Sequence, residues 1–201
     1  MMIRWIVVDG IDGSGKSSHA KIIKAYYESR GEKVHLMIHP SDRAWGRLSR
    51  KALQGKGSLM QLLASVFFLL DVLFALKRRC VWRENDTVIT VRYLMATAYL
   101  PGRLAEAGYM LFHRLLPVPP RLILIDTWPH LALERIASRN HEREMFETLS
   151  KLEEVRGKML SLAGEEWSIL ENNTSPKEST CRLLTILSSW DSDLGDQEHI
   201  P

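Results

Sequence analysis

An eight-residue segment near the N-terminus constrains the fold of this chain more than any other feature. Residues 10–17 read Gly-Ile-Asp-Gly-Ser-Gly-Lys-Ser and satisfy the pattern G-x-x-x-x-G-K-[ST]. The segment lies between a β-branched apolar run and an amphipathic one, where such a loop wraps phosphate oxygens with backbone N–H groups. We therefore expect a P-loop that binds ATP and Mg²⁺, with Lys16 on the terminal phosphates and the Ser17 hydroxyl on the metal. The residues assigned to nucleotide binding are Gly10, Asp12, Gly13, Ser14, Gly15, Lys16, Ser17 and Ser18.

Short apolar runs alternate with longer helical segments along the whole chain. The predicted strands cover residues 3–8, 34–38, 87–91, 122–125 and 167–170. These runs are apolar on both faces, as in parallel strands that are covered by helices on each side. The predicted helices cover residues 16–29, 44–53, 59–76, 103–115, 131–139, 146–162 and 176–189. The alternation predicts a three-layer α/β sandwich around a parallel sheet, with ligands at the carboxyl ends of the strands.

Length and composition are typical of one soluble globular domain. The 201 residues are 45% hydrophobic and 25% charged, without repeats or linkers, so we treat residues 1–189 as a single domain. Cys80 and Cys181 are too few for a disulfide framework and lack metal-ligand spacing. The N-terminus does not follow the pattern of a cleaved signal peptide. We therefore expect a cytoplasmic protein.

Charge is distributed unevenly along the chain. The net charge of +3 combines 27 basic with 24 acidic residues. Four of the acids follow Trp190, so residues 1–189 carry a net charge of +7, and we expect residues 190–201 to form a flexible acidic tail. A modest basic excess suits any anionic ligand, and no nucleic-acid-binding motif is present. We therefore expect phosphorylated small molecules, and no nucleic acid, as partners.

One segment, residues 59–76, is unusually apolar. Gln61, Ser65 and Asp71 interrupt it, and three basic residues follow it directly. Its length is marginal for a membrane span, and an acidic residue inside a span is costly. We therefore interpret it as a buried or subunit-interface helix and expect no membrane association.

Several segments resemble the thymidylate kinase family of nucleoside monophosphate kinases. The loop at residues 7–18 is similar to the family's P-loop, and residues 120–126, 132–136, 146–147 and 154–156 resemble its fourth strand, the following helix, the lid and the next helix. The resemblance implies a five-stranded parallel sheet with helices on both faces, a small lid at about residues 138–147, and a homodimer. It also implies phosphoryl transfer from ATP to a nucleoside monophosphate, with dTMP as the expected acceptor and dTDP as the product.

The resemblance also implies roles for individual residues. Asp12 matches the family carboxylate that accepts a hydrogen bond from the acceptor's 3′-hydroxyl, and Arg92 matches the arginine on the acceptor phosphate. Gly13 stands where some members carry a catalytic arginine, which favours a lid cation, Arg139 or Arg143, with Arg156 as a weaker candidate. The catalytic set is therefore Lys16, Arg92, Arg139 and Arg143.

The family's metal-ordering position is altered in this chain. An Asp-Arg-Tyr segment normally follows the third strand, but here it reads Val91-Arg92-Tyr93, which removes a carboxylate near Mg²⁺. Asp9 and Asp126, at the ends of two flanking strands, are the obvious substitutes. The predicted metal ligands are therefore Ser17, Asp9 and Asp126.

The base-binding positions are altered as well. Phe68 and Asp71 align with a family segment Phe-x-x-Asp-Arg, but its base-reading arginine is Val72 here. Tyr99 matches a family tyrosine but lies one residue closer to Arg92 than usual. The predicted acceptor-binding set is Asp12, Phe68, Asp71, Arg92 and Tyr99. These departures leave two alternatives open: a different small-molecule acceptor, or a nucleotide-binding module with little catalytic activity.

Overall fold

A parallel five-stranded sheet forms the centre of the molecule. The computed structural model describes residues 3–55, 57–77, 82–138 and 148–197. The strands are β1 (Arg4–Gly10), β2 (Val34–Ile38), β3 (Thr87–Val91), β4 (Arg121–Asp126) and β5 (Trp167–Glu171), in the order β2-β3-β1-β4-β5. The helices are α1 (Lys16–Glu28), α2 (Ala44–Leu53), α3 (Ser58–Leu76), the 3₁₀ helix η2 (Met95–Tyr99), α4 (Leu104–Leu115), α5 (Pro129–Ala137), α6 (Leu149–Ala163) and α7 (Pro176–Gln197). The predicted α/β architecture is confirmed.

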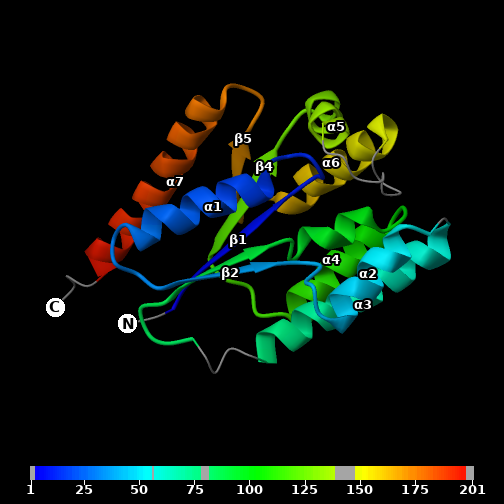
Figure 1. Cartoon of the computed structure of the whole chain (residues 1–201), viewed down its shortest axis with the longest axis horizontal. Coiled ribbons are helices and arrows are strands. Elements are labelled where there is room, and N and C mark those ends of the chain that lie inside the picture. The colour runs from blue at the N-terminus through cyan, green and yellow to red at the C-terminus, as the bar shows by residue number, and fades with distance from the viewer. Residues whose placement is uncertain (1–2, 56, 78–81, 139–147, 198–201) are drawn as a thin grey trace.

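Helices cover both faces of the sheet, because successive side chains of each strand point to opposite sides. On β1, Ile6 and Val8 pack in the core beneath α1 and α7, whereas Trp5 and Val7 pack in the core shared with α3, α4 and α6. Figure 1 shows α1 and α7 on one side of the sheet and α2, α3 and α4 on the other. The three layers leave the carboxyl end of β1 at the central position of the sheet edge, where the P-loop begins.

The last helix extends past its predicted end, into the segment that was expected to form an acidic tail; residues 198–201 of that segment lie outside the described residues. Helix α7 continues to Gln197. The hydroxyls of Tyr26 and Tyr27 each donate a hydrogen bond to Asp191 at 3.2 Å, and Arg4 Nη2 lies 3.5 Å from the same carboxylate. Asp191 therefore holds the end of α7 against α1 and β1. The length of the helix could not be predicted from local sequence, because the partners of Asp191 are distant along the chain.

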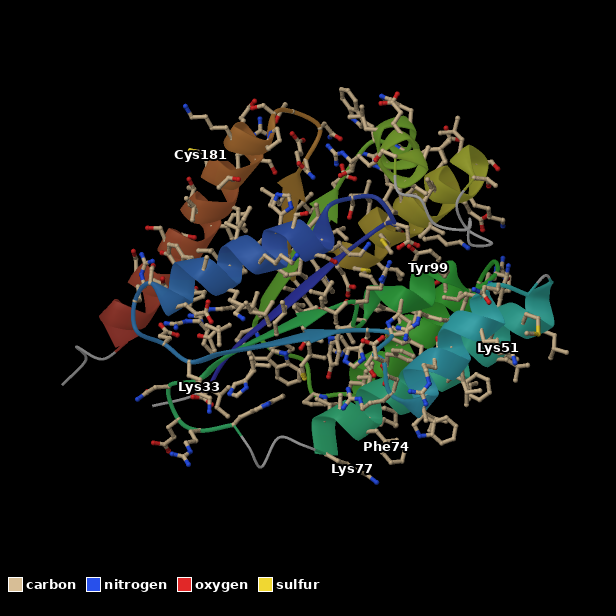
Figure 2. All side chains as sticks on the ribbon, viewed as in Figure 1. Lys33, Lys51, Phe74, Lys77, Tyr99 and Cys181 are labelled. Carbon is tan, nitrogen blue, oxygen red and sulfur yellow. The ribbon has the colours of Figure 1, made fainter. Side chains whose placement is uncertain are left out.

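Helix α3 exposes an apolar surface. Leu59–Leu76 is the one helical stretch among the described residues that is long and apolar enough to cross a membrane by length and composition, and 28% of it is buried. Core helices of soluble proteins meet the same criteria, so the stretch is weak evidence for a span. Figure 2 shows Phe74 and Lys77 projecting from the outer side of this helix, with the Lys77 ammonium 4.9 Å from the Phe74 ring centroid.

Candidate active site

The P-loop joins the end of β1 to the first turn of α1. Gly13 has a φ of +76°, and a Cβ atom there would lie 2.3 Å from the Ala132 carbonyl oxygen. Any side chain at this position is therefore strained and sterically blocked, which explains why the arginine of some family members cannot stand here. This steric block is consistent with the expectation that another segment supplies the catalytic cation.

Two side chains of the loop are placed to meet phosphate. Lys16 is buried, its Nζ donates to the Ile11 carbonyl oxygen at 2.5 Å, and it lies 3.7 Å from Asp12 Oδ1. Ser14 Oγ is buried and has no hydrogen-bond partner in the described part of the chain. A buried polar atom without a partner is costly, so the loop fits an oxygen-rich anion that accepts this hydroxyl.

Asp12, Arg92 and Tyr99 form one hydrogen-bonded group beside the loop. The Arg92 guanidinium donates to Asp12 Oδ1, and the Tyr99 hydroxyl donates to Asp12 Oδ2 at 2.9 Å. Burial alone raises the pKa of Asp12, but the nearby charges of Arg92 and Lys16 outweigh it and hold the pKa below its ordinary value. The carboxylate is therefore ionised at neutral pH. Tyr99 reaches Asp12 from helix η2, although it lies one residue closer to Arg92 than in the family pattern.

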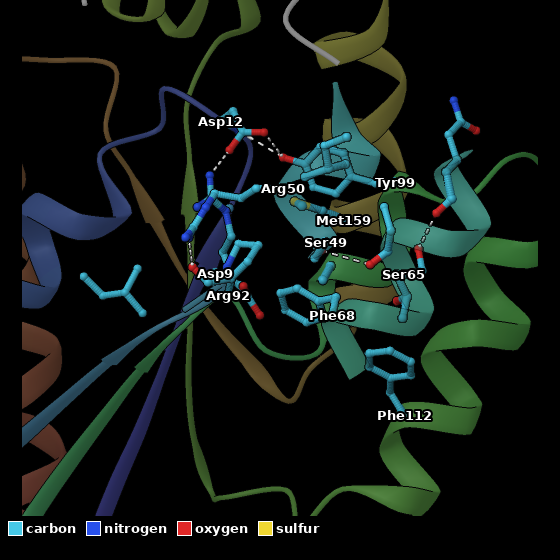
Figure 3. A pocket seen from close by; sticks show the side chains of 18 residues that line it. Asp9, Asp12, Ser49, Arg50, Ser65, Phe68, Arg92, Tyr99, Phe112 and Met159 are labelled. Atoms are coloured by element: carbon cyan, nitrogen blue, oxygen red, sulfur yellow. Dashed lines mark hydrogen bonds and ion pairs between the residues drawn. The ribbon is translucent and has the colours of Figure 1, made fainter. Parts of the chain in front are cut away.

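A cavity of about 260 Å³ opens beside this group. Figure 3 shows Asp12, Arg50 and Arg92 on one side of it and Phe68 and Phe112 on the other. The remaining labelled lining residues are Asp9, Ser49, Ser65, Tyr99 and Met159. The cavity thus has a charged end next to the P-loop and an aromatic end away from it, which suits a ligand with a phosphate and a planar ring.

Asp71 was predicted as an acceptor-binding residue, but the structure places it behind the cavity wall. Its carboxylate is buried and accepts hydrogen bonds from His39 Nδ1 at 2.6 Å, from the Ser41 backbone N–H at 2.8 Å and from the Ser41 hydroxyl. Burial raises the pKa of Asp71, but these hydrogen bonds from His39 and Ser41 together lower it to about 2. Asp71 contacts the loop after β2, and it is not among the residues that line the cavity.

The two carboxylates predicted as metal ligands already have partners in the structure. Asp9 accepts hydrogen bonds from the backbone N–H groups of Tyr93 and Met95, each at 3.1 Å, and burial raises its pKa. Arg156 binds Asp126 in a bidentate manner, at 2.6 Å from Nε to Oδ1 and 2.7 Å from Nη2 to Oδ2. The described residues contain no group of three or more His, Cys, Asp or Glu side chains that could hold a metal.

Mg²⁺ nevertheless fits the first turn of α1. Ser17 is exposed there, directly after Lys16. Mg²⁺ usually keeps several waters and is held by few protein ligands together with substrate phosphates. A single hydroxyl beside a phosphate-binding loop is consistent with that requirement.

Four positions singled out in the sequence lie outside the cavity or outside the described residues, and one residue that was not singled out lines the cavity. Val72 and Val91, which replace polar family residues, are fully buried in opposite cores and do not line the cavity. The lid residues Arg139 and Arg143 lie outside the described residues. Sequence reasoning missed Arg50, because it belongs to α2 and reaches the cavity only through tertiary packing.

The fold and the site together define a P-loop protein with a second ligand cavity beside its phosphate loop, the organisation of a nucleotide kinase. The family model of thymidylate kinase matches residues 8–182, and the chain belongs to this family.

Similar proteins cover almost the whole chain. A thymidylate kinase of Leptospira borgpetersenii is 28% identical over 90% of this chain and 92% of its own length. A probable thymidylate kinase of Pyrobaculum aerophilum is 30% identical over 91% of this chain and 95% of its own length. The solved structure of thymidylate kinase from Candida albicans superimposes with a TM-score of 0.75 at 17% identity, covering 94% of this chain and 92% of that one.

Proposed function

We propose that this protein transfers the γ-phosphoryl group of ATP to dTMP, giving ADP and dTDP. The observation that carries this proposal is the cavity that joins Asp12 and Arg92, next to the P-loop, to an aromatic wall at Phe68. Membership of the thymidylate kinase family supports the same reaction. An acceptor phosphate held at Arg92 would lie near the phosphates held by Lys16.

The residues act through positioning and charge. Lys16 and the backbone N–H groups of the loop hold the β- and γ-phosphates of ATP. Arg92 contacts Asp12 in this structure. When the acceptor binds, Arg92 donates hydrogen bonds to its phosphate, and Asp12 accepts a hydrogen bond from its sugar hydroxyl. An acceptor phosphate oxygen forms the new bond to the γ-phosphorus while the bond to the β–γ bridging oxygen breaks and ADP leaves.

Charge on the transferring group needs further cations. The lid arginines Arg139 and Arg143 are proposed for this role, because closure of a lid over the phosphates excludes water and supplies positive charge. Mg²⁺, held by the Ser17 hydroxyl and phosphate oxygens, would neutralise charge on the nucleotide. Arg156 forms an ion pair with Asp126, so we propose that it holds α6 against β4.

We also propose a cytoplasmic homodimer built on α3. Leu59, Leu62 and Val66 on this helix are 70%, 49% and 46% exposed. A contiguous exposed apolar surface of this kind is typical of a protein interface. Burying it in a second copy would remove it from water without a membrane.

Steady-state kinetics with ATP, Mg²⁺ and a panel of acceptors tests the proposed function. We expect dTMP to give a higher kcat/KM than dUMP, CMP or UMP, because the aromatic wall suits a methylated pyrimidine. A higher kcat/KM with another member of the panel would replace dTMP as the acceptor. ATP binding without turnover of any acceptor would overturn the proposal.

A further inference from the structure

A buried hydrogen bond joins the loop after β2 to α3, behind the cavity wall. His39 and Asp71 are each 1% exposed, and His39 Nδ1 lies 2.6 Å from Asp71 Oδ2. The carboxylate also accepts the two hydrogen bonds from Ser41, so every contact around it is a donor. His39 Nδ1 therefore carries the hydrogen and donates it to Asp71.

The same histidine contacts both ends of the cavity. Its ring meets the Phe68 ring edge to face, with centroids 6.0 Å apart and an interplanar angle of 70°. Its backbone carbonyl oxygen accepts a hydrogen bond from Arg92 Nη1 at 3.4 Å, and its backbone N–H donates to Val91 at 3.0 Å. His39 thus connects the aromatic wall, the phosphate-binding arginine and the sheet.

We propose that His39, fixed by Asp71, is the positioning residue of the acceptor site. It holds the Phe68 ring against the cavity and gives the Arg92 guanidinium a second anchor besides Asp12. Asp71 acts through His39 and does not itself contact the acceptor. The inference rests on the proposed function, because that function assigns Phe68 and Arg92 to the acceptor.

Two substitutions separate positioning from simple packing. In His39→Leu the side-chain volume is largely kept but the N–H donor is lost, whereas in His39→Asn an amide N–H can take the place of Nδ1–H. We expect His39→Leu to raise KM for dTMP about tenfold, the effect of one buried hydrogen bond to a charged group, with KM for ATP unchanged. His39→Asn should recover most of the lost affinity for dTMP.

The chain supplies a matched control on the same strand. His35 Nε2 lies 2.7 Å from Asp86 Oδ2, and this pair sits at the opposite end of β2 from the cavity. His35→Leu removes a histidine–aspartate hydrogen bond of the same kind. We expect it to leave both KM values unchanged, whatever it does to the melting temperature.

Three results would overturn the inference. They are an unchanged KM for dTMP in His39→Leu, an equal rise of both KM values, and a failure of His39→Asn to recover affinity. If His39→Leu does not fold, Ser41→Ala replaces it, because that variant removes one hydrogen-bond donor to Asp71. We expect Ser41→Ala to raise KM for dTMP and to leave KM for ATP unchanged. An unchanged KM for dTMP would contradict the inference.

Failure of the proposed function is recognised separately, in the wild-type protein. Absence of dTMP turnover by the wild type overturns the function, and calorimetric binding of dTMP then decides the inference. Weaker binding to His39→Leu than to the wild type would support the positioning role. Equal affinities, or no binding of dTMP to the wild type, would overturn it.

Discussion

Asp12 links the two halves of the site at the scale of single residues. It lies between Lys16, the proposed donor-side cation, and Arg92, the proposed acceptor-side cation, and both cations favour its ionised form. The P-loop motif placed Lys16 on the phosphates of ATP, and the family resemblance implied the roles of Asp12 and Arg92 at the acceptor. The sequence did not predict that both cations contact the Asp12 carboxylate. It did not predict the partners of Asp71, since His39 and Ser41 reach that carboxylate only through the packing of α3 on the loop after β2.

Substitution of Lys16 tests the donor side. Lys16→Ala should lower kcat by about 10²–10³-fold, the effect of removing one preorganised donor from a developing charge, and the melting temperature should change little. Lys24→Ala is the control, because Lys24 lies on the same helix and its side chain is 40% exposed. A Lys16→Ala enzyme with kcat close to the wild-type value would contradict this assignment.

Acid titration tests the environment of Asp71. Its pKa in the folded state is about 2, below the value of about 3.9 of an ordinary aspartate, so its ionised form stabilises the fold. This stabilisation, about 2–3 kcal/mol, is complete above pH of about 4 and is lost as the pH falls through the folded-state pKa.

The measurement is the free energy of unfolding in urea, for the wild type and for Asp71→Asn, at a series of pH values. We expect the variant to be less stable at pH 7 and the difference to shrink as the pH falls below about 4. A difference that stays constant down to pH of about 2 would mean that Asp71 is not held by these hydrogen bonds.

At the scale of elements, the positions of the strands and helices can be predicted from local sequence patterns. The residues at which they end cannot be predicted in the same way. The five strands are apolar on both faces, so their existence and parallel arrangement were predictable from the sequence. The end of α7 was not, because Asp191 has its partners on α1 and β1, more than 160 positions away in the case of Tyr26 and Tyr27. The aromatic wall at Phe68 and Phe112 likewise depends on how α3 and α4 pack.

Removal of the Asp191 carboxylate tests the docking of α7. Asp191→Ala should lower the free energy of unfolding by about 1–2 kcal/mol, because two tyrosine hydroxyls lose their acceptor. We expect kcat to stay unchanged, since these residues lie at the opposite end of β1 from the P-loop. Ser192→Ala, at an exposed neighbouring position, is the control, and equal destabilisation by the two changes would contradict the docking role.

At the scale of the whole molecule, helix α3 presents an exposed apolar surface. Helix α3 lines the cavity with one side and exposes Leu62 and Val66 on another. An interface at this helix would therefore lie directly behind the aromatic wall of the cavity. Family membership supports the kinase activity, whereas the assembly has to be measured.

Sedimentation or light scattering measures that assembly. We expect the wild type to be a dimer and Val66→Glu to be a monomer, because a charge at a buried interface is costly. Leu184→Glu places the same charge on α7, at a residue that is 37% exposed, and should leave the dimer intact. A monomeric wild type, or a dimeric Val66→Glu variant, would exclude this interface.

Phosphorus NMR of the complete reaction follows the proposed phosphoryl transfer directly. With ATP, Mg²⁺ and dTMP, we expect the resonances of ATP and dTMP to decline together while those of ADP and dTDP appear in equal amounts. Omission of dTMP should leave ATP intact. Consumption of ATP to ADP and inorganic phosphate, with dTMP unchanged, would show that the cavity beside Asp12 and Arg92 does not deliver this acceptor to the P-loop.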